Sequence, residues 1–352
     1  MRYFAILAIL IFFSFTADAQ QTFSISGTVK NAKGEPLNAA TIFIASSQKS
    51  TSTNATGAFT IANLSPGTYQ LVMSNVGYAS LKRDIIIRDK SVVLDTVLQE
   101  RSVVLDEVVI GDNNQKKGFI KTFTKYFLGE SENGKACKIL NPEKLEFSTN
   151  KKLLKAYSQD FLTIENANLG YRLKYMLRNF QYDSSIDATF YDGESVFEDM
   201  EGTPAQKQVW TANRKKAYQG SLMHYLRALH SNTTREEGFL TYTIRNILLP
   251  LVIAPNPVFT EQLIARTDSN FLKFNYKKRL YTLYDKKKAS ADDKPSNRTE
   301  IIIDVAPTGS ILMLDADIDK RGSYSAYQSI LIQGFWGTKR IGDQLPFEYL
   351  PN

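Results

Sequence analysis

Between Phe23 and Leu98, apolar and polar residues alternate in short runs, and each run ends in a turn. The clearest turns are Asn31-Ala32-Lys33-Gly34, Asn54-Ala55-Thr56-Gly57 and Ser65-Pro66-Gly67. A period of two indicates a β-strand with one buried face, and Pro and Gly supply the backbone angles of tight turns. Short strands about every ten residues are typical of a β-sandwich, so we predict an all-β sandwich.

Several motifs occur in a characteristic order along this segment. They are Gly27-Thr28-Val29, Gly34-Glu35-Pro36-Leu37, Ala40-Thr41-Ile42, Thr56-Gly57-Ala58-Phe59-Thr60-Ile61, Leu64-Ser65-Pro66-Gly67-Thr68-Tyr69 and Val76-Gly77-Tyr78. In this order they resemble the carboxypeptidase regulatory-like domain, and the resemblance implies a transthyretin-like or Ig-like sandwich of seven strands. Thr56 stands where that family often has an acidic residue. The resemblance implies a scaffold or adhesion module, and similar domains open outer-membrane receptors and many exported proteins of Gram-negative bacteria.

The resemblance does not imply peptidase activity. A zinc carboxypeptidase needs His-x-x-Glu and a second His, because a catalytic zinc takes three protein ligands and keeps one position open. The two histidines, His224 and His230, are followed three positions later by Arg227 and Thr233. The single Cys137 excludes an intrachain disulfide and a cysteine-based zinc site. We therefore expect neither a metal nor another cofactor.

The first 19 residues have the three parts of a secretory signal peptide, with one early positive charge, an apolar run and Ala17-Asp18-Ala19. We expect cleavage after Ala19 and export to the periplasm, the outer membrane or the cell surface. The apolar run is too short to span a bilayer, and we expect no transmembrane span in the mature chain. Export argues against nucleic acid as the partner of this chain, whose net charge is +7.

The chain length of 352 residues favours two domains after the signal peptide. We predict the sandwich at residues 20–100 and a second domain at residues 117–352. Residues 101–116 between them are either a linker or contain the last sandwich strand, since Val103 to Ile110 is apolar enough for a strand. A similar Leu-Asp-Glu-Val-Val segment links the sandwich to a plug and barrel in import receptors, but the chain that follows here is too short for both.

The second domain mixes the two periodicities. Residues 117–129 have apolar residues at helical spacing, and a longer helix over 204–230 begins at Thr203-Pro204, a favourable N-cap and first helical residue. Strands are predicted at 145–148, 152–157, 161–164, 169–179, 189–191, 239–244, 271–276, 280–284, 300–305 and 311–319. We predict an α+β domain with a mainly antiparallel sheet or partly closed barrel and one long helix. It resembles uncharacterised exported proteins, which imply no activity.

The helix predicted over 204–230 carries the best candidate site. Its members are Arg214, Tyr218, Ser221, His224 and Arg227. Residues three and four apart share a helix face, so these side chains could line a pocket for an anionic or sugar ligand. The alternative is a helix that packs on a sheet with its arginines at the edge. His224 has the pKa range of a general base, but spacing names no partner for it.

Two groups of carboxylates are the remaining candidates. The first is Asp183, Asp187, Asp192, Glu194, Glu198, Asp199 and Glu201; the second is Asp315, Asp317 and Asp319. Calcium binding or a glycosidase pair would use such oxygens. We expect a solvated, turn-rich loop for the first group. For the second group we expect the solvent face of a strand, since Lys320 and Ala326 replace the Gly and Glu of a calcium loop.

The sequence thus predicts a non-enzymatic cell-envelope protein that binds or docks a glycan, a receptor or another envelope protein. The prediction rests on the signal peptide, the sandwich and the lack of a catalytic signature in the sequence. The alternative is a carboxylate-dependent hydrolase acting on polysaccharide or peptidoglycan. A third possibility is a structural part of a larger outer-membrane assembly.

Overall fold

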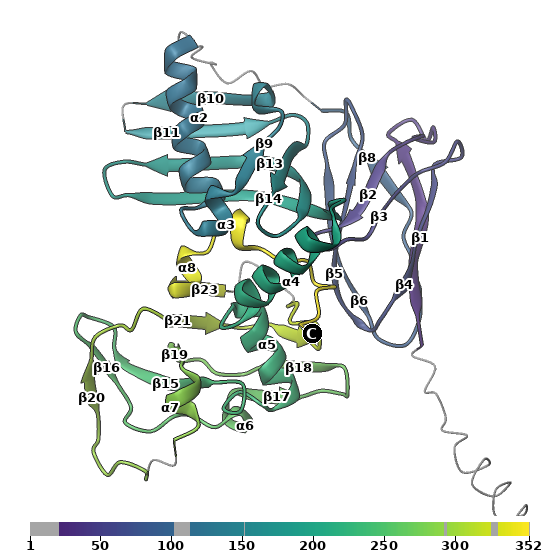
Figure 1. Cartoon of the computed structure of the whole chain (residues 1–352). Helices are drawn as coiled ribbons and strands as arrows, with labels where there is room; N and C mark the ends of the chain where they lie inside the picture. The colour runs from purple at the N-terminus through teal and green to yellow at the C-terminus, as the bar shows by residue number, and fades with distance from the viewer. Residues whose placement is uncertain (1–20, 102–112, 151, 292–293, 325–329, 352) are drawn as a thin grey trace, which may run out of the picture.

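The computed structural model describes residues 21–101, 113–150, 152–291, 294–324 and 330–351. The predicted signal peptide and most of the segment 101–116 lie outside these residues. The described chain forms three β-units, with the sandwich beside two further sheet-containing units and with helices and the C-terminal segment between them (Figure 1). Within the described residues, no helix is long and apolar enough to cross a membrane.

The first unit is the predicted sandwich. Its strands are β1 (Phe23–Asn31), β2 (Thr41–Ile44), β3 (Ser50–Ser52), β4 (Ala58–Leu64), β5 (Gly67–Ser74), β6 (Leu81–Ile87), β7 (Val92–Val93) and β8 (Thr96–Leu98). One sheet has the order β4-β1-β7 with β8 also on β1, and the other has the order β3-β2-β5-β6. The alternating side chains that the sequence singles out, such as Ile25, Ile42 and Leu71, are fully buried between the two sheets.

The sandwich has one strand more than the seven expected, because the run from Val92 to Leu98 is interrupted. A Cβ on Gly27 would lie 1.9 Å from the carbonyl oxygen of Leu94, so only glycine lets the chain cross β1 there. Asp95 then accepts hydrogen bonds from the backbone N–H and hydroxyl of Thr28 at 2.9 and 2.7 Å. These contacts end β7 and start β8.

The second unit is an antiparallel sheet covered by a helix. Its elements are α2 (Asn113–Leu128), α3 (Glu132–Lys135), β9 (Cys137–Ile139), η1 (Pro142–Lys144), β10 (Leu145–Asn150), β11 (Leu153–Ser158), β12 (Leu162–Asn166), β13 (Tyr171–Asp183) and β14 (Ala188–Asp199). The order is β10-β11-β13-β12-β9, and β14 pairs with β13 along almost its whole length. The helix α2 lies across one face (Figure 1) and buries Phe123 and Phe127 against Phe180.

This arrangement corrects one sequence expectation. The acidic stretch 183–201 is not a solvated, turn-rich loop but is mainly the strand β14. Its buried positions, Val196 and Phe197 among them, alternate poorly with the acids, because both faces of β14 are partly covered. The period-two signal of a half-buried strand is therefore weak in this segment.

The third unit contains an open six-stranded sheet and a small three-stranded one. Its elements are β15 (Phe239–Asn246), β16 (Leu251–Ile253), α6 (Thr260–Leu263), β17 (Ile264–Arg266), β18 (Phe271–Phe274), β19 (Leu280–Tyr284), α7 (Lys286–Ala289), β20 (Ile301–Ile303), β21 (Gly309–Leu314), β22 (Asp317–Asp319), β23 (Ile330–Gly334), α8 (Phe335–Thr338) and η3 (Ile341–Asp343). The orders are β20-β16-β15-β19-β21-β23 and β17-β18-β22. The fold is thus α+β and mainly antiparallel as predicted, with open sheets rather than a partly closed barrel.

The predicted long helix is two helices, α4 (Pro204–Tyr218) and α5 (Leu222–Ser231). The chain breaks at Gly220, which has a φ of 74° and whose Cβ would lie 2.6 Å from the Tyr284 ring. Ser221 then caps α5 by accepting a hydrogen bond from the backbone N–H of His224. The break lets α4 pack on the second unit while α5 packs on the third (Figure 1).

Candidate binding site at the junction of the three units

Arg214 holds α4 to the second unit. Its guanidinium donates to the carbonyl oxygens of Leu169 and Gly170 at 2.7 and 3.0 Å and to the Asp199 carboxylate at 2.9 Å. It also lies 3.7 Å above the centre of the Tyr171 ring. These contacts fix the Arg214 guanidinium between α4 and the second unit.

Arg227 holds the end of the chain. It donates to the carbonyl oxygens of Arg321, Phe347 and Tyr349 at 2.9, 3.0 and 2.7 Å. Its guanidinium is also 5.4 Å from the centre of the buried Tyr218 ring. Since a guanidinium has five N–H donors in a fixed fork, three backbone acceptors determine its position. Arg227 thus anchors the C-terminal segment to α5.

His224 is buried between the aromatic rings of Tyr218, Phe239 and Tyr284. Its Nδ1 accepts the backbone N–H of Gly220 at 3.0 Å, so the ring proton is on Nε2, which faces the Glu237 carboxylate at 3.1 Å. Burial lowers the pKa of His224, although the hydrogen bond to Glu237 acts in the opposite direction. Both ring nitrogens are occupied, so this histidine is a structural residue of the helix break.

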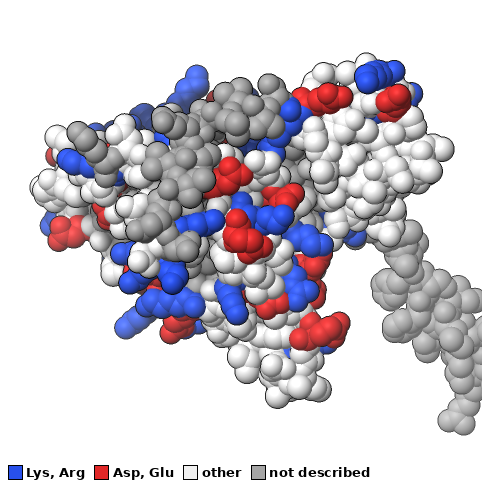
Figure 2. Space-filling model, turned by 90° about the horizontal axis from the view of Figure 1, so that it is seen from above, with Lys and Arg blue, Asp and Glu red and all other residues white. Residues whose placement is uncertain are grey.

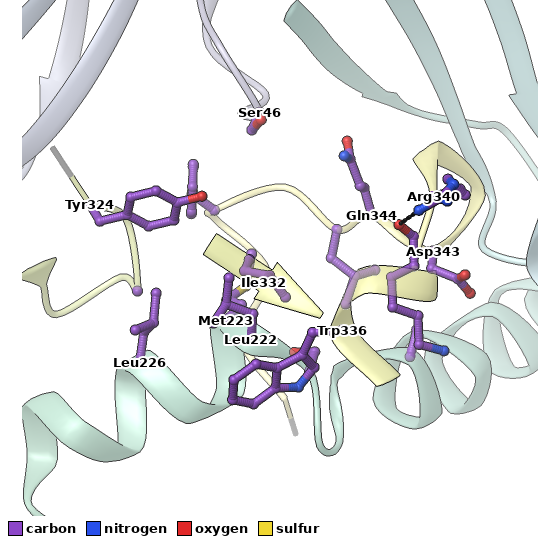
Figure 3. A pocket seen from close by; sticks show the side chains of 16 residues that line it. Ser46, Leu222, Met223, Leu226, Tyr324, Ile332, Trp336, Arg340, Asp343 and Gln344 are labelled. Carbon is purple, nitrogen blue, oxygen red and sulfur yellow. Dashed lines mark hydrogen bonds between the residues drawn. The ribbon is translucent and has the colours of Figure 1, made fainter. Parts of the chain in front are cut away.

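A cavity of about 340 Å³ lies on the other side of α5, where the three units meet. Its lining includes Ser46, Ala217, Ser221, Leu222, Met223, Leu226, Tyr324, Ile332, Trp336, Leu345 and Phe347. Figure 3 shows Leu222, Met223, Leu226, Ile332 and Trp336 on one side of it and Ser46, from the sandwich loop between β2 and β3, on the other. Of the five predicted site residues, Ser221 alone lines this cavity among the residues described.

The polar groups of this junction cavity lie on the C-terminal segment. Arg340, Asp343 and Gln344 form its third side (Figure 3), with Lys339 also in the lining. Asp343 accepts hydrogen bonds from Ser131 and Asn133 at 2.9 and 3.0 Å, and Arg340 donates to the carbonyl oxygen of Gly337 at 2.6 Å. The side chains of Arg340 and Asp343 are therefore engaged within the protein, and the lining of the cavity outside this segment is mainly apolar.

The acidic side chains of β14 are paired with cations. Arg178 binds both Asp192 and Glu194, and Lys82 of the sandwich lies 3.2 Å from the buried Glu194. The hydrogen bond from Arg178 lowers the pKa of Asp192. Outside this cluster, Glu198 pairs with Lys174 and Asp199 with Arg214, and Asp187 accepts from Tyr126 and Tyr182. These carboxylates stabilise the sheet and its contact with the sandwich.

The second acidic group also departs from expectation. Asp315, Asp317 and Asp319 do not share one exposed strand face, because the chain breaks between β21 and β22 and Asp319 is fully buried. Asp319 accepts hydrogen bonds from the Arg321 guanidinium at 2.7 Å and from the backbone N–H of Thr68 at 2.8 Å. Arg321 in turn stacks 3.9 Å from the centre of the Tyr69 ring. This group joins the sandwich to the third unit.

The remaining candidates for site chemistry are groups of metal-ligating side chains and the thiol of Cys137. Among the residues described, no group of three or more His, Cys, Asp or Glu side chains is arranged to hold a metal ion. Burial raises the pKa of the Cys137 thiol to about 12, and its sulfur donates to the carbonyl oxygen of Asn133. A thiol with so high a pKa is a poor nucleophile at neutral pH.

Sequence reasoning missed the residues that matter most at the junction, Arg321, Trp336 and Ser46. Trp336 donates to the carbonyl oxygen of Gly220 at 2.7 Å, which ties α8 to the helix break. The motif Gly334-Phe335-Trp336-Gly337 is visible in the sequence as a local cluster of aromatic residues and glycines. It could have indicated a packed turn, but nothing in it points to Gly220.

Comparison with known proteins supports the identity of the first unit. Residues 25–110 match the model of the CarboxypepD_reg-like domain family. The comparison with curated proteins gave no match. In each solved structure described next, the match covers only part of this chain.

Three solved structures illustrate the structural likeness. One chain of a type II cohesin–X-dockerin complex from Acetivibrio cellulolyticus matches with 19% identity over 22% of this chain and 56% of that chain, at a TM-score of 0.20. A streptococcal ancillary pilin matches with 18% identity over 24% of this chain and 34% of that chain, at a TM-score of 0.21. A DUF3823 family protein from Bacteroides ovatus matches with 12% identity over 52% of this chain and 83% of that chain, at a TM-score of 0.19.

This chain thus spans about a third to three fifths of the length of the matched cohesin–X-dockerin and pilin chains. At TM-scores near 0.2, none of the three likenesses carries an argument about function. The family match at residues 25–110 overlaps the described sandwich from β1 to β8. The N-terminal part of this protein is therefore a carboxypeptidase regulatory-like domain, packed against a C-terminal region of two further β-units.

Proposed function

We propose that this chain is a non-enzymatic protein of the cell envelope that docks another envelope protein. The junction cavity would receive an apolar side chain of that partner. The observation that carries the proposal is the apolar side of the cavity, where Leu222, Leu226, Ile332 and Trp336 line a space of about 340 Å³. Envelope localisation rests on the predicted signal peptide, which the sequence alone supports.

The cavity suits a protein side chain better than a glycan. Its volume lies at the lower end of the range for ligand sites, roughly 300–1,000 Å³, which favours a small apolar group over an extended sugar chain. A sugar would need hydrogen-bonding partners for its hydroxyl groups. Here Ser221 caps α5, Asp343 accepts from Ser131 and Asn133, and Arg340 donates to Gly337, so these three side chains are engaged within the protein. The C-terminal segment adds Lys339 and Gln344 to the lining, and the residues of α5 in it are mainly apolar.

The three units also form a preorganised surface around the cavity. The backbone N–H of Ser46 donates to the carbonyl oxygen of Ser195, and that of Phe347 donates to the carbonyl oxygen of Ser46, at 2.7 and 2.9 Å. The sandwich loop is thereby fixed to β14 and to the C-terminal segment. A surface that is already ordered loses less conformational entropy on binding, which favours affinity.

The alternative of a carboxylate-dependent hydrolase has no supporting geometry among the described residues. Asp192 and Glu194 share Arg178, and Asp319 is buried against Arg321. A retaining or inverting glycosidase needs two carboxyl groups that face each other across a cleft, one of them kept protonated at neutral pH. At Asp192 the hydrogen bond from Arg178 lowers the pKa of the carboxyl group, which favours its ionised form instead.

The proposal is tested by adding charge to the cavity. Met223→Glu places a carboxylate in the apolar lining at the second residue of α5, where the helix N-terminus tolerates an acid. Because a buried unpaired charge is costly, capture of the partner should fall at least about tenfold. Crosslinking in cells that express the tagged chain, followed by purification and mass spectrometry, measures which envelope proteins are captured.

The matched control is Met313→Glu, the same change at a methionine that is 43% exposed on β21 and outside the cavity lining. It should leave capture unchanged, and thermal unfolding checks that both variants fold. Equal capture by Met223→Glu and the original chain would contradict the proposal. Binding to a glycan array that is lost in Met223→Glu alone would replace the protein partner by a sugar.

A further inference from the structure

The hairpin between β15 and β16 presents two large apolar side chains to solvent. Leu248 and Leu249 in its turn are 71% and 77% exposed, and Ile302, on the neighbouring strand β20, is 68% exposed. Ile302 pairs with Val252 of β16, so it lies beside the hairpin. The turn is ordered by the backbone N–H of Leu248, which donates to the Asn246 side chain at 3.0 Å. Single exposed leucines are common, but three large apolar residues at one end of a sheet are not.

Basic side chains gather at the same end of the sheet. Arg245 precedes the turn, and the backbone N–H of Ile244 donates to the carbonyl oxygen of Arg279 at 3.0 Å, which places the loop carrying Lys277, Lys278 and Arg279 beside it. All four basic residues are exposed. Within the described part of the chain, none of them forms an ion pair. Their charge is therefore available to an outside partner.

Two acidic residues lie at the neighbouring strand ends and reduce this charge. Asp304 follows β20 and Asp315 follows β21, and both are exposed. The four cations still exceed them. In the face of the molecule shown in Figure 2, positive and negative side chains are interspersed.

We propose that this end of the third unit, Leu248, Leu249 and Ile302 with Arg245, Lys277, Lys278 and Arg279, docks on an anionic phospholipid bilayer. Apolar side chains that enter the interface, flanked by cations that contact the headgroups, are the two elements of reversible membrane association. The edge formed by β16 and β20 lies on the side of the molecule away from the sandwich (Figure 1). The junction cavity would remain accessible to a protein partner.

Vesicle binding by the mature chain, residues 20–352, tests the proposal. The original chain should sediment with vesicles of phosphatidylcholine and phosphatidylglycerol and much less with phosphatidylcholine alone. Each lysine near an anionic surface contributes about fivefold in affinity, so Lys277→Gln/Lys278→Gln should weaken binding about 25-fold. Leu248→Ser/Leu249→Ser should weaken it at least about tenfold, because two apolar side chains no longer enter the interface.

The matched control is Lys286→Gln/Lys287→Gln, which removes the same charge from α7 at the opposite end of β15. It should change binding by less than about twofold. In Leu249→Trp, the fluorescence of the new tryptophan should shift to shorter wavelength when anionic vesicles are added, which shows that the turn itself enters the bilayer.

Several results would overturn the membrane proposal. One is a failure of the original chain to sediment with anionic vesicles, and another is an equal loss of binding in the α7 control. Unchanged binding by the leucine variant would indicate a purely electrostatic contact with a polyanion. Loss of the crosslinked protein partner in the leucine variant, with vesicle binding intact, would assign this surface to that protein instead.

Discussion

The sandwich meets the two other units through contacts of opposite chemistry. Against the second unit it buries an apolar cluster, Phe43 and Val72 on its own strands with Met176 and Val196 on β13 and β14. Against the third unit it buries the ion pair between Asp319 and Arg321, together with Thr68. Both contacts hold the same domain, but they respond differently to change.

The difference follows from how each contact gains stability. An apolar cluster stabilises in proportion to the area removed from water, and losing one side chain removes only its share. A buried ion pair contributes little net stability because both ions lose their hydration, but it is costly to break. The apolar contact thus supplies stability, whereas the ion pair makes the angle between the sandwich and the third unit depend on two specific residues.

The largest expected effect comes from breaking the ion pair. Arg321→Met leaves the fully buried Asp319 carboxylate without its cation and should reduce the free energy of unfolding by about 3–5 kcal/mol. Urea unfolding followed by circular dichroism measures the loss. The control is Arg88→Met, which breaks an ion pair with Asp268 at the same interface, where both side chains are more than a third exposed.

That exposed pair should be worth less than about 1 kcal/mol. If Arg321→Met reduces the free energy of unfolding no more than Arg88→Met does, the Asp319 carboxylate is hydrated in solution. The buried ion pair would then be no more sensitive to substitution than the exposed one. The double variant Asp319→Leu/Arg321→Met should recover only part of the loss, since no buried charge remains but the backbone N–H of Thr68 loses its acceptor.

A smaller effect is expected in the apolar contact. Met176 is 8% exposed and packs among Phe43, Val72 and Val196, so Met176→Ala should reduce the free energy of unfolding by about 2–3 kcal/mol. The same urea titration measures it. A loss well below 1 kcal/mol would show that the cluster collapses around the cavity without cost.

A chain that carries both Arg321→Met and Met176→Ala tests whether the two contacts depend on each other. Its loss of unfolding free energy should be smaller than the sum of the losses in the two single variants. Once either contact has failed, the sandwich is partly released and the other contact is worth less. Residues that share no partner usually give losses that add within about 0.5 kcal/mol. Strict additivity would therefore indicate that the two contacts act independently.

Breaking the ion pair between Lys82 and Glu194, beside the apolar contact, should reduce the free energy of unfolding less still. Lys82 is 39% exposed in its side chain, and Glu194 keeps Arg178 as a second cation. Lys82→Met should therefore change the free energy of unfolding by less than about 1 kcal/mol, and the change should shrink further in high salt. Urea titrations at low and high salt measure both. A loss comparable with that of Arg321→Met would show that Glu194 depends on Lys82.

How much of this could be predicted from sequence depends on how local the signals are. The sandwich is predictable because its period of two and its turns, such as Ser65-Pro66-Gly67, lie within a few residues of each other. The helix break at Gly220 was missed because Thr203-Pro204 and the apolar spacing favour one continuous helix. The sequence Gly220-Ser221, a glycine followed by an N-cap residue, was the available signal.

The junction was not predictable, because its contacts join distant parts of the chain. The local sequence indicates that Asp319 faces solvent on a strand. In the structure, Thr68, 251 positions earlier, donates a hydrogen bond to it. The predicted residues Arg214 and Arg227 are indeed near the junction, but they bind backbone carbonyl groups, which no sequence pattern reveals. A side chain's type predicts what it can bind, whereas the fold determines whether it is already occupied.

The smallest expected effect is a pH dependence that should be confined to the third unit. His224 and His230 both lie on α5, and burial lowers the pKa of each below its usual value near 6.5. Above that value both are neutral in the folded and unfolded chain. As the pH falls below it, the unfolded chain binds protons that the folded chain does not, so stability decreases with decreasing pH.

Between about pH 7 and pH 5, the free energy of unfolding should therefore decrease, and His224→Gln/His230→Gln should make it decrease less. The comparison is made within each variant across pH, because either substitution also changes the absolute stability of a buried site. Asp192, whose pKa Arg178 lowers, titrates only at more acidic pH and does not contribute in this range. Hydrogen exchange at the two pH values locates the loss: faster exchange in α5 and the third unit is expected, with the sandwich contact at β14 unchanged. Equal acceleration in both would mean that the ion-paired and apolar contacts open together, so that the sandwich and both sheets behave as a single cooperative unit.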